Sequence, residues 1–202
     1  LHVAAAQVHS KGPVPETLKR MERQVKAASI VGAQTILFSE CALHGYDYDL
    51  TPESVRNVAE PMDSPNCRKV IAMAARHGVA ILVGFFERNG DAIHNSILIA
   101  RPDKTSDVVR KHILTEGELR AKLTPGPKER PIFEFNGVRV GILICADTGL
   151  EGVQEDLHTR GADYRFISTG GGGKVQDMLH ESDLLTEEGR KKYTENRPRV
   201  FN

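Results

Sequence analysis

The chain has 202 residues, enough for one domain with a sizeable hydrophobic core. Its 27 basic and 27 acidic side chains balance, so charge predicts no nucleic-acid partner and no anionic membrane surface. No apolar run approaches the roughly 20 residues that span a bilayer, and the first ten residues do not resemble a signal peptide. Three cysteines without a CxxC pair argue against a disulfide framework and a zinc site, and we expect free thiols in a cytoplasmic protein.

The order of apolar and amphipathic segments predicts an α/β fold. Apolar residues recur at helical spacing from Glu16 to Val31, and Gly32 follows as a candidate C-cap. Further helices are expected over residues 65–78 and 152–161. Strands are expected within residues 1–8, 34–40, 79–88, 94–104, 107–114, 130–147 and 162–169, with a hairpin turn at Asn136-Gly137. Because hairpins interrupt the alternation of strands and helices, we expect a mixed sheet.

Three residues with side chains that could take part in catalysis stand at predicted strand ends: Glu40, Lys111 and Cys145. Each alone has a plain structural explanation, as a solvated carboxylate, a surface ammonium or a packed thiol. A free thiol has a pKa of about 8.5 and needs a base or a cation to react at neutral pH. A carboxylate can take its proton and return it to a leaving amine, and an ammonium can stabilise the oxyanion. Together the three residues form a set for acyl transfer that needs no histidine.

The segments around these residues resemble the nitrilase superfamily of carbon-nitrogen hydrolases. "FSECALHGYD" is similar to the family's base motif, "VRKHILTEGELRAKLTPG" to its lysine motif and "VGILICADTGLEGVQEDLHTRGADY" to its nucleophile motif. The resemblance covers residues 3 to about 167, with the three motifs in the family's order. It implies a four-layer α-β-β-α sandwich of nitrilase type with a mixed sheet, as a single carbon-nitrogen hydrolase domain over residues 1–202.

The resemblance also implies roles for individual residues. Glu40 matches the general base, Lys111 the cation that stabilises the oxyanion, and Cys145 the nucleophile. A second glutamate lies between the lysine and the Pro-Gly of its motif in members of the family. Glu118 is our candidate, with Glu116 as the alternative.

Three further residues are predicted to contact the substrate. The backbone N–H of Ala146, directly after the nucleophile, is expected to donate to the oxyanion. Tyr46 belongs to the Gly-Tyr that follows the base motif. His44 lies close to Glu40 in the sequence and is expected either to line the pocket or to be an ordinary loop residue.

The sequence departs from the family pattern at several points. Ser39 stands where a proline usually precedes the base, and His112 follows the lysine one position early. The segment 148–152 is smaller than usual, and "STGGGGK" replaces a segment that normally shapes the pocket wall. The family continues through further strands after a Glu-Asn motif, which "TENRPRVFN" resembles. We therefore expect missing C-terminal strands, in a truncated protein or a shortened relative, and residues 172–202 show no clear pattern.

These observations predict a thiol hydrolase that cleaves a non-peptide C–N bond of a small amide or carbamoyl compound through a cysteine thioester. The preference for an amidase over a nitrile-cleaving enzyme rests on analogy with the family. No metal or cofactor is predicted, since the histidines are dispersed and "GGGGK" lacks the Ser or Thr of a phosphate loop. A homodimer or larger homo-oligomer is expected from the family. The alternatives are an acyltransferase that uses the same thioester, a catalytically inactive binding or scaffold protein, and a redox-sensing thiol protein.

Overall fold

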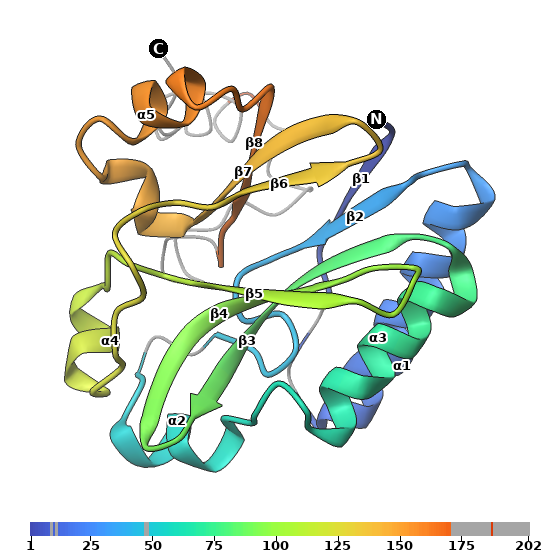
Figure 1. Cartoon of the computed structure of the whole chain (residues 1–202). Helices are drawn as coiled ribbons and strands as arrows, with labels where there is room; N and C mark the ends of the chain where they lie inside the picture. Colours follow the sequence, from blue (N-terminus) through green and yellow to red (C-terminus); the bar gives the residue numbers. More distant parts are fainter. Residues whose placement is uncertain (9, 11, 47–48, 171–186, 188–202) are drawn as a thin grey trace. The chain divides into compact units, whose positions relative to one another are not determined.

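The computed structural model of the chain describes residues 1–8, 10, 12–46, 49–170 and 187, and Leu1–Gly170 form one compact unit. The predictions for 172–202 fall outside the described residues, apart from residue 187. Within the compact unit, the strands form two sheets (Figure 1). The first has the order β1–β2–β3–β4–β5, made of Val3–Ala6, Thr35–Phe38, Ala80–Asn89, Ala92–Ala100 and Ser106–Arg110. The second has the order β6–β7–β8, made of Ile132–Phe135, Val138–Ile144 and Tyr164–Ser168.

Both sheets mix parallel and antiparallel neighbours, as predicted. Strands β1, β2 and β3 are parallel, whereas β3, β4 and β5 run antiparallel through two hairpins. In the second sheet β6 and β7 form the predicted hairpin, with positive φ angles of 49° at Asn136 and 77° at Gly137. Such angles belong to the turns that match the twist of paired strands. Strand β8 is parallel to β7.

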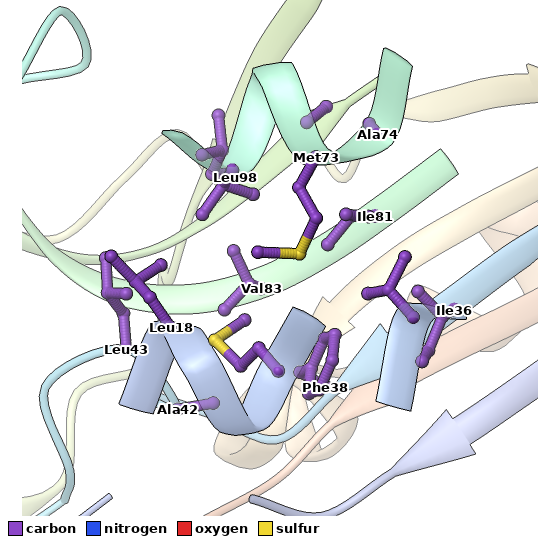
Figure 2. Close-up of a cluster of buried hydrophobic side chains, with 14 of the residues drawn as sticks. Leu18, Ile36, Phe38, Ala42, Leu43, Met73, Ala74, Ile81, Val83 and Leu98 are labelled. Carbon is purple, nitrogen blue, oxygen red and sulfur yellow. The ribbon is translucent and has the colours of Figure 1, made fainter. Parts of the chain in front are cut away.

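Two helices cover one face of the first sheet. Helix α1 spans Val14–Ile30 and α3 spans Pro65–His77, which ends at Gly78 with a φ of 66°. Figure 2 shows how Leu18 of α1 and Met73 of α3 pack over the strand side chains, and the whole cluster is buried. The strand side chains labelled in this cluster are Ile36, Phe38, Ile81, Val83 and Leu98.

The other face of the first sheet packs against the second sheet. Along β3 the side chains alternate, so that odd positions face the helices while Ala80 and Leu82 face the second sheet. They meet Val140 and Ile142 of β7 in a second buried cluster. Helix α5, Val153–Thr159, packs through Leu157 on the far side of the second sheet. The layers are therefore helix, sheet, sheet and helix, which confirms the predicted sandwich.

Two short helices were not predicted from the sequence. Helix α2 spans Pro52–Val58 and α4 spans Glu116–Arg120, and both are too short to show a helical repeat of apolar residues. Each follows a threonine whose hydroxyl caps the helix, in a capping box. The predicted strand over 107–114 was wrong beyond Arg110, where β5 ends. Within the described residues no helix is both long and apolar enough to cross a membrane.

Candidate active site

The three residues singled out at strand ends do lie at strand ends. Glu40 comes two residues after β2, Lys111 directly follows β5, and Cys145 directly follows β7 as the first residue of the short helix η1, Cys145–Gly149. A hydrogen bond joins the two sheets near this point, since the hydroxyl of Ser168 donates to the carbonyl oxygen of Phe38 at 2.9 Å. Sheet packing thus brings residues more than 100 positions apart in the sequence to one edge.

Two carboxylates converge on one ammonium in the interior. The Nζ of Lys111 lies 2.7 Å from Oε1 of Glu40 and 2.8 Å from Oε2 of Glu118. Lys111 and Glu118 are fully buried, and Glu40 is 4% exposed. Burial disfavours the charged ammonium, but the two carboxylates outweigh it and raise the pKa of Lys111 above its usual range. Lys111 therefore remains a cation at every physiological pH.

Cys145 is partly exposed beside this cluster. Its backbone φ is 45°, in the left-handed region that residues other than glycine rarely adopt. Burial and the negative charge of Glu40 raise the pKa of the Cys145 thiol, and Lys111 and the Thr169 hydroxyl offset part of that rise. The thiol accordingly rests protonated at neutral pH, with a carboxylate next to it. Positive φ angles outside glycine often mark functional sites, because the strain is held by the surrounding structure.

The geometry separates the two candidates for the second glutamate. Glu118 occupies the third position of α4 and also closes the capping box, since its Oε2 accepts from the backbone N–H of Thr115 at 2.8 Å. Glu116 points outward instead, with a side chain that is 90% exposed. Glu118 is the glutamate that reaches Lys111.

Asn95, in the middle of β4, also belongs to this cluster. Its amide nitrogen lies 2.8 Å from Oε1 of Glu40 and 2.5 Å from Oε1 of Glu118. The thiol of Cys41 donates to its Oδ1 at 3.5 Å. The sequence suggested no role for Asn95 and only packing for Cys41, and the available signal was the polar run His94-Asn95-Ser96 within the strand.

A second buried ion pair lies next to Cys145. Asp147 in η1 and Arg130 are 2.9 Å apart, and both are at most 1% exposed. The Asp147 carboxylate also accepts from the backbone N–H groups of His112 at 2.9 Å and Ile113 at 2.8 Å. It further accepts from that of Ile144 at 3.2 Å. The pair therefore ties the segment after Lys111 to the turn that carries Cys145.

Comparison with known proteins agrees with this arrangement. A profile of the carbon-nitrogen hydrolase family matches residues 2–185. The chain belongs to this family. The potato (Solanum tuberosum) N-carbamoylputrescine amidase is 28% identical over 180 residues, covering 87% of this chain and 60% of that protein. An (R)-stereoselective amidase of a Pseudomonas species is 26% identical over 157 residues, covering 77% of this chain and 56% of that protein.

Solved structures of carbon-nitrogen hydrolases share the fold. The carbon-nitrogen hydrolase of Helicobacter pylori G27 has a TM-score of 0.75 at 16% identity, over 95% of this chain and 67% of that one. A mutant amidase of Nesterenkonia sp. AN1, with acrylamide added to its active-site cysteine, has a TM-score of 0.71 at 17% identity. That match covers 90% of this chain and 72% of the amidase. This chain spans 54–60% of the length of the curated relatives that it matches.

The three predicted substrate contacts lie in different surroundings. Ala146 is the second residue of η1, where backbone N–H groups have no partner within the helix. Tyr46 is half-buried, and its hydroxyl lies 3.3 Å from that of Thr115. The His44 ring is buried, with Nε2 2.8 Å from Glu60 and Nδ1 accepting from the N–H of Phe86 at 3.1 Å. These contacts hold its loop to β3.

A glycine lets the segment that carries Glu40 lie directly on the first sheet. A Cβ added at Gly84 in β3 would lie 2.2 Å from the backbone nitrogen of Cys41 and 2.8 Å from the Cα of Glu40. The backbone N–H of Leu43 donates to the Gly84 carbonyl oxygen at 3.0 Å. No side chain fits between the strand and the turn, so the backbone of the base rests on the backbone of β3.

No metal ligands gather around this cluster in the part of the chain that the structure describes. No group of three or more His, Cys, Asp and Glu residues in that part is arranged to hold a metal ion. The carboxylates of Glu40 and Glu118 already accept hydrogen bonds from Lys111 and Asn95. Further, Oε2 of Glu40 accepts from the backbone N–H of Gly170 at 2.9 Å.

Proposed function

We propose that this chain carries the catalytic residues of an amidase-type hydrolase, which cleaves the C–N bond of a small amide or carbamoyl compound through a thioester on Cys145. The observation that carries the proposal is the convergence of Glu40, Glu118 and Lys111 beside a partly exposed cysteine. Relatives named as amidases support the reaction class. The substrate itself stays open to experiment.

The protonated state of the Cys145 thiol at neutral pH supports a first step that depends on a base. Because burial and Glu40 raise the pKa of the Cys145 thiol, a ready-made thiolate is scarce at neutral pH. Glu40 takes the thiol proton as the sulfur attacks the carbonyl carbon, and it gives that proton to the departing amine or ammonia. Glu40 then takes a proton from the water that cleaves the thioester, and returns it to the sulfur at the end of the cycle.

Two donors suit the oxyanion that forms during attack. The Lys111 ammonium donates to Oε1 of Glu40 at 2.7 Å and to both carboxylate oxygens of Glu118, at 2.8 and 3.1 Å, and the longest of these contacts is the one that the oxyanion would replace. The backbone N–H of Ala146 is the second donor, at the start of η1. Donors held in place by a buried network stabilise developing charge without a reorganisation cost.

Tyr46 is proposed to contact substrate, since its ring lies against Gly170 and thus close to Glu40.

A homodimer or larger homo-oligomer is proposed on the family resemblance, and light scattering of the purified protein tests it. No metal or cofactor enters the mechanism.

The central test combines ammonia release with mass spectrometry. The protein is incubated with a panel of small amides and N-carbamoyl compounds, and we expect ammonia from at least one. Cys145→Ala should abolish release, while Cys67→Ala, which removes a buried thiol on α3, should retain it. Iodoacetamide should label Cys145 before the other two thiols.

The same experiment distinguishes the rival functions. No ammonia from any compound, with equal labelling of the three cysteines, would favour a binding or scaffold protein. An acyl adduct that passes to hydroxylamine or an amine faster than to water would favour an acyltransferase. Reversible oxidation of Cys145 by peroxide without turnover would favour a redox sensor.

A further inference from the structure

Asn95 contacts both carboxylates of the proposed site but has no atom that reacts. The residue is 1% exposed and lies on β4, between His94 and Ser96. An ionised carboxylate only accepts hydrogen bonds, so the contacts at 2.8 Å to Glu40 and 2.5 Å to Glu118 each use one N–H of the amide. The amide therefore bridges the two carboxylates.

The charge balance explains why the site needs such a bridge. Two buried carboxylates share the single ammonium of Lys111, which leaves one excess negative charge. Like charges in close contact favour uptake of a proton by one of them. A neutral amide supplies a donor to each carboxylate without adding a second cation, so it offsets part of the repulsion between them and holds both beside Lys111.

Cys41 determines which way the amide faces. Its buried thiol lies 3.5 Å from Oδ1 of Asn95, and burial, reinforced by Glu40, raises the pKa of that thiol well above its usual range. The thiol thus stays protonated and is a donor at physiological pH. A flipped amide would place its oxygen against two carboxylates and its NH₂ group against a donor thiol.

We propose that Asn95 is a positioning residue, whose amide, oriented by the thiol of Cys41, holds the carboxylates of Glu40 and Glu118 together around Lys111. The inference rests on the proposed function, in which Glu40 is the base. The charges of both carboxylates raise the pKa values of three neighbouring groups, Lys111, Cys41 and Tyr46. Cys145 senses Glu40 and Lys111.

The test follows Cys145 alkylation by iodoacetamide from pH 5.5 to 9, site by site, by mass spectrometry. In Asn95→Ala we expect the Glu40 carboxylate to lose its fixed position beside Cys145. Its charge then contributes less to the raised thiol pKa, so Cys145 reacts about 3- to 10-fold faster at pH 6–7. With a substrate amide that the protein hydrolyses, kcat should fall at least tenfold, because a displaced base is less effective.

The chain supplies a matched control for Asn95→Ala. Asn66 donates to Glu60 at 3.2 and 3.4 Å, on the first turn of α3. Asn66→Ala removes the same kind of amide–carboxylate contact, and we expect it to leave the Cys145 profile unchanged. Protection of Cys67 from alkylation reports that each variant is folded.

Two substitutions of Cys41 test the orientation step. Cys41→Ala should shift the Cys145 profile in the same direction as Asn95→Ala, and Cys41→Ser, which restores a donor, should return it toward the wild type. Both variants keep the backbone at φ 50°, so strain is common to them. This pair decides the matter if Asn95→Ala does not fold.

The inference and the proposed function fail separately. An unchanged Cys145 profile in folded Asn95→Ala, or equal profiles for Cys41→Ala and Cys41→Ser, overturns the positioning role. Alkylation needs no substrate, so a shifted profile in a protein that releases no ammonia overturns the amidase and leaves the Asn95 network standing.

Discussion

Two buried ion clusters adjoin in this protein, where Asp147 accepts from the backbone N–H of His112 directly after Lys111, and they differ in charge balance. Asp147 and Arg130 form a one-to-one pair, and backbone N–H and C=O groups satisfy the remaining capacity of both side chains. The cluster around Lys111 holds two carboxylates for one ammonium, with Asn95 as a neutral donor. The balanced pair is suited to fixing the backbone. The unbalanced cluster retains a carboxylate that can take up a proton, which is what acid–base chemistry requires.

The largest effect is expected from removing the charge of Glu40. Glu40→Gln should lower turnover by about 10²–10⁴-fold, because the base is lost. The same change should speed alkylation of Cys145 at neutral pH, since the charge that helps to raise its thiol pKa has gone while Lys111 remains. Loss of turnover together with faster alkylation of Cys145 would show that the base has been lost while the fold is intact. Slower alkylation in a folded variant would contradict this account of the cluster.

Breaking the balanced pair should affect folding more than chemistry. Asp147→Asn leaves the buried Arg130 without its counter-ion, and such losses typically cost about 3–5 kcal/mol of unfolding free energy. Urea unfolding measures this cost. Asp156→Asn is the matched control, because it breaks a pair with Arg160 whose side chains are 50% and 30% exposed. Exposed pairs contribute about 0–1 kcal/mol, so similar losses in both variants would refute the distinction.

A smaller effect is expected at alkaline pH from Tyr46, which is half-buried and interacts with the unbalanced cluster. Burial raises the pKa of Tyr46 to about 12, with further increases from Glu118 and Glu40 and an opposing effect from its hydrogen bond with Thr115. The folded state then binds the phenol proton more tightly than the unfolded state. This contribution to stability is complete below about pH 10 and is lost as the pH rises toward 12. Tyr46→Phe should therefore lose stability less steeply over that range, measured by urea midpoints. Equal slopes of stability against pH for Tyr46→Phe and the wild type would rule out this contribution of Tyr46.

The sequence predicted the parts of the fold and site that depend on local patterns. Apolar alternation and turn residues placed the strands and the hairpin at Asn136-Gly137, and the end of a strand placed Glu40, Lys111 and Cys145. The resemblance to a family added the order of the motifs and the candidate Glu118. These signals are either patterns within a few neighbouring residues or motifs that the chain shares with known proteins.

What the sequence did not predict depends on packing between distant segments. Asn95 joins the site only because β4 lies between β3 and β5, which no local pattern around it reveals. Arg130 is an ordinary charged residue until the fold buries it against Asp147. The sequence also left Glu116 and Glu118 unresolved, since one turn of a five-residue helix decides which of them points inward.

The site depends on Gly84, a residue that has no reactive group of its own and no room for a side chain. A methyl group at that position would fall within 2.2 Å of the main chain beside Glu40, closer than any two such atoms tolerate. Even alanine would have to lift the base away from its strand. A screen for activity would register the position as intolerant, and a search for reacting groups would pass over it. Here the placement of a carboxylate depends on an atom that must be absent.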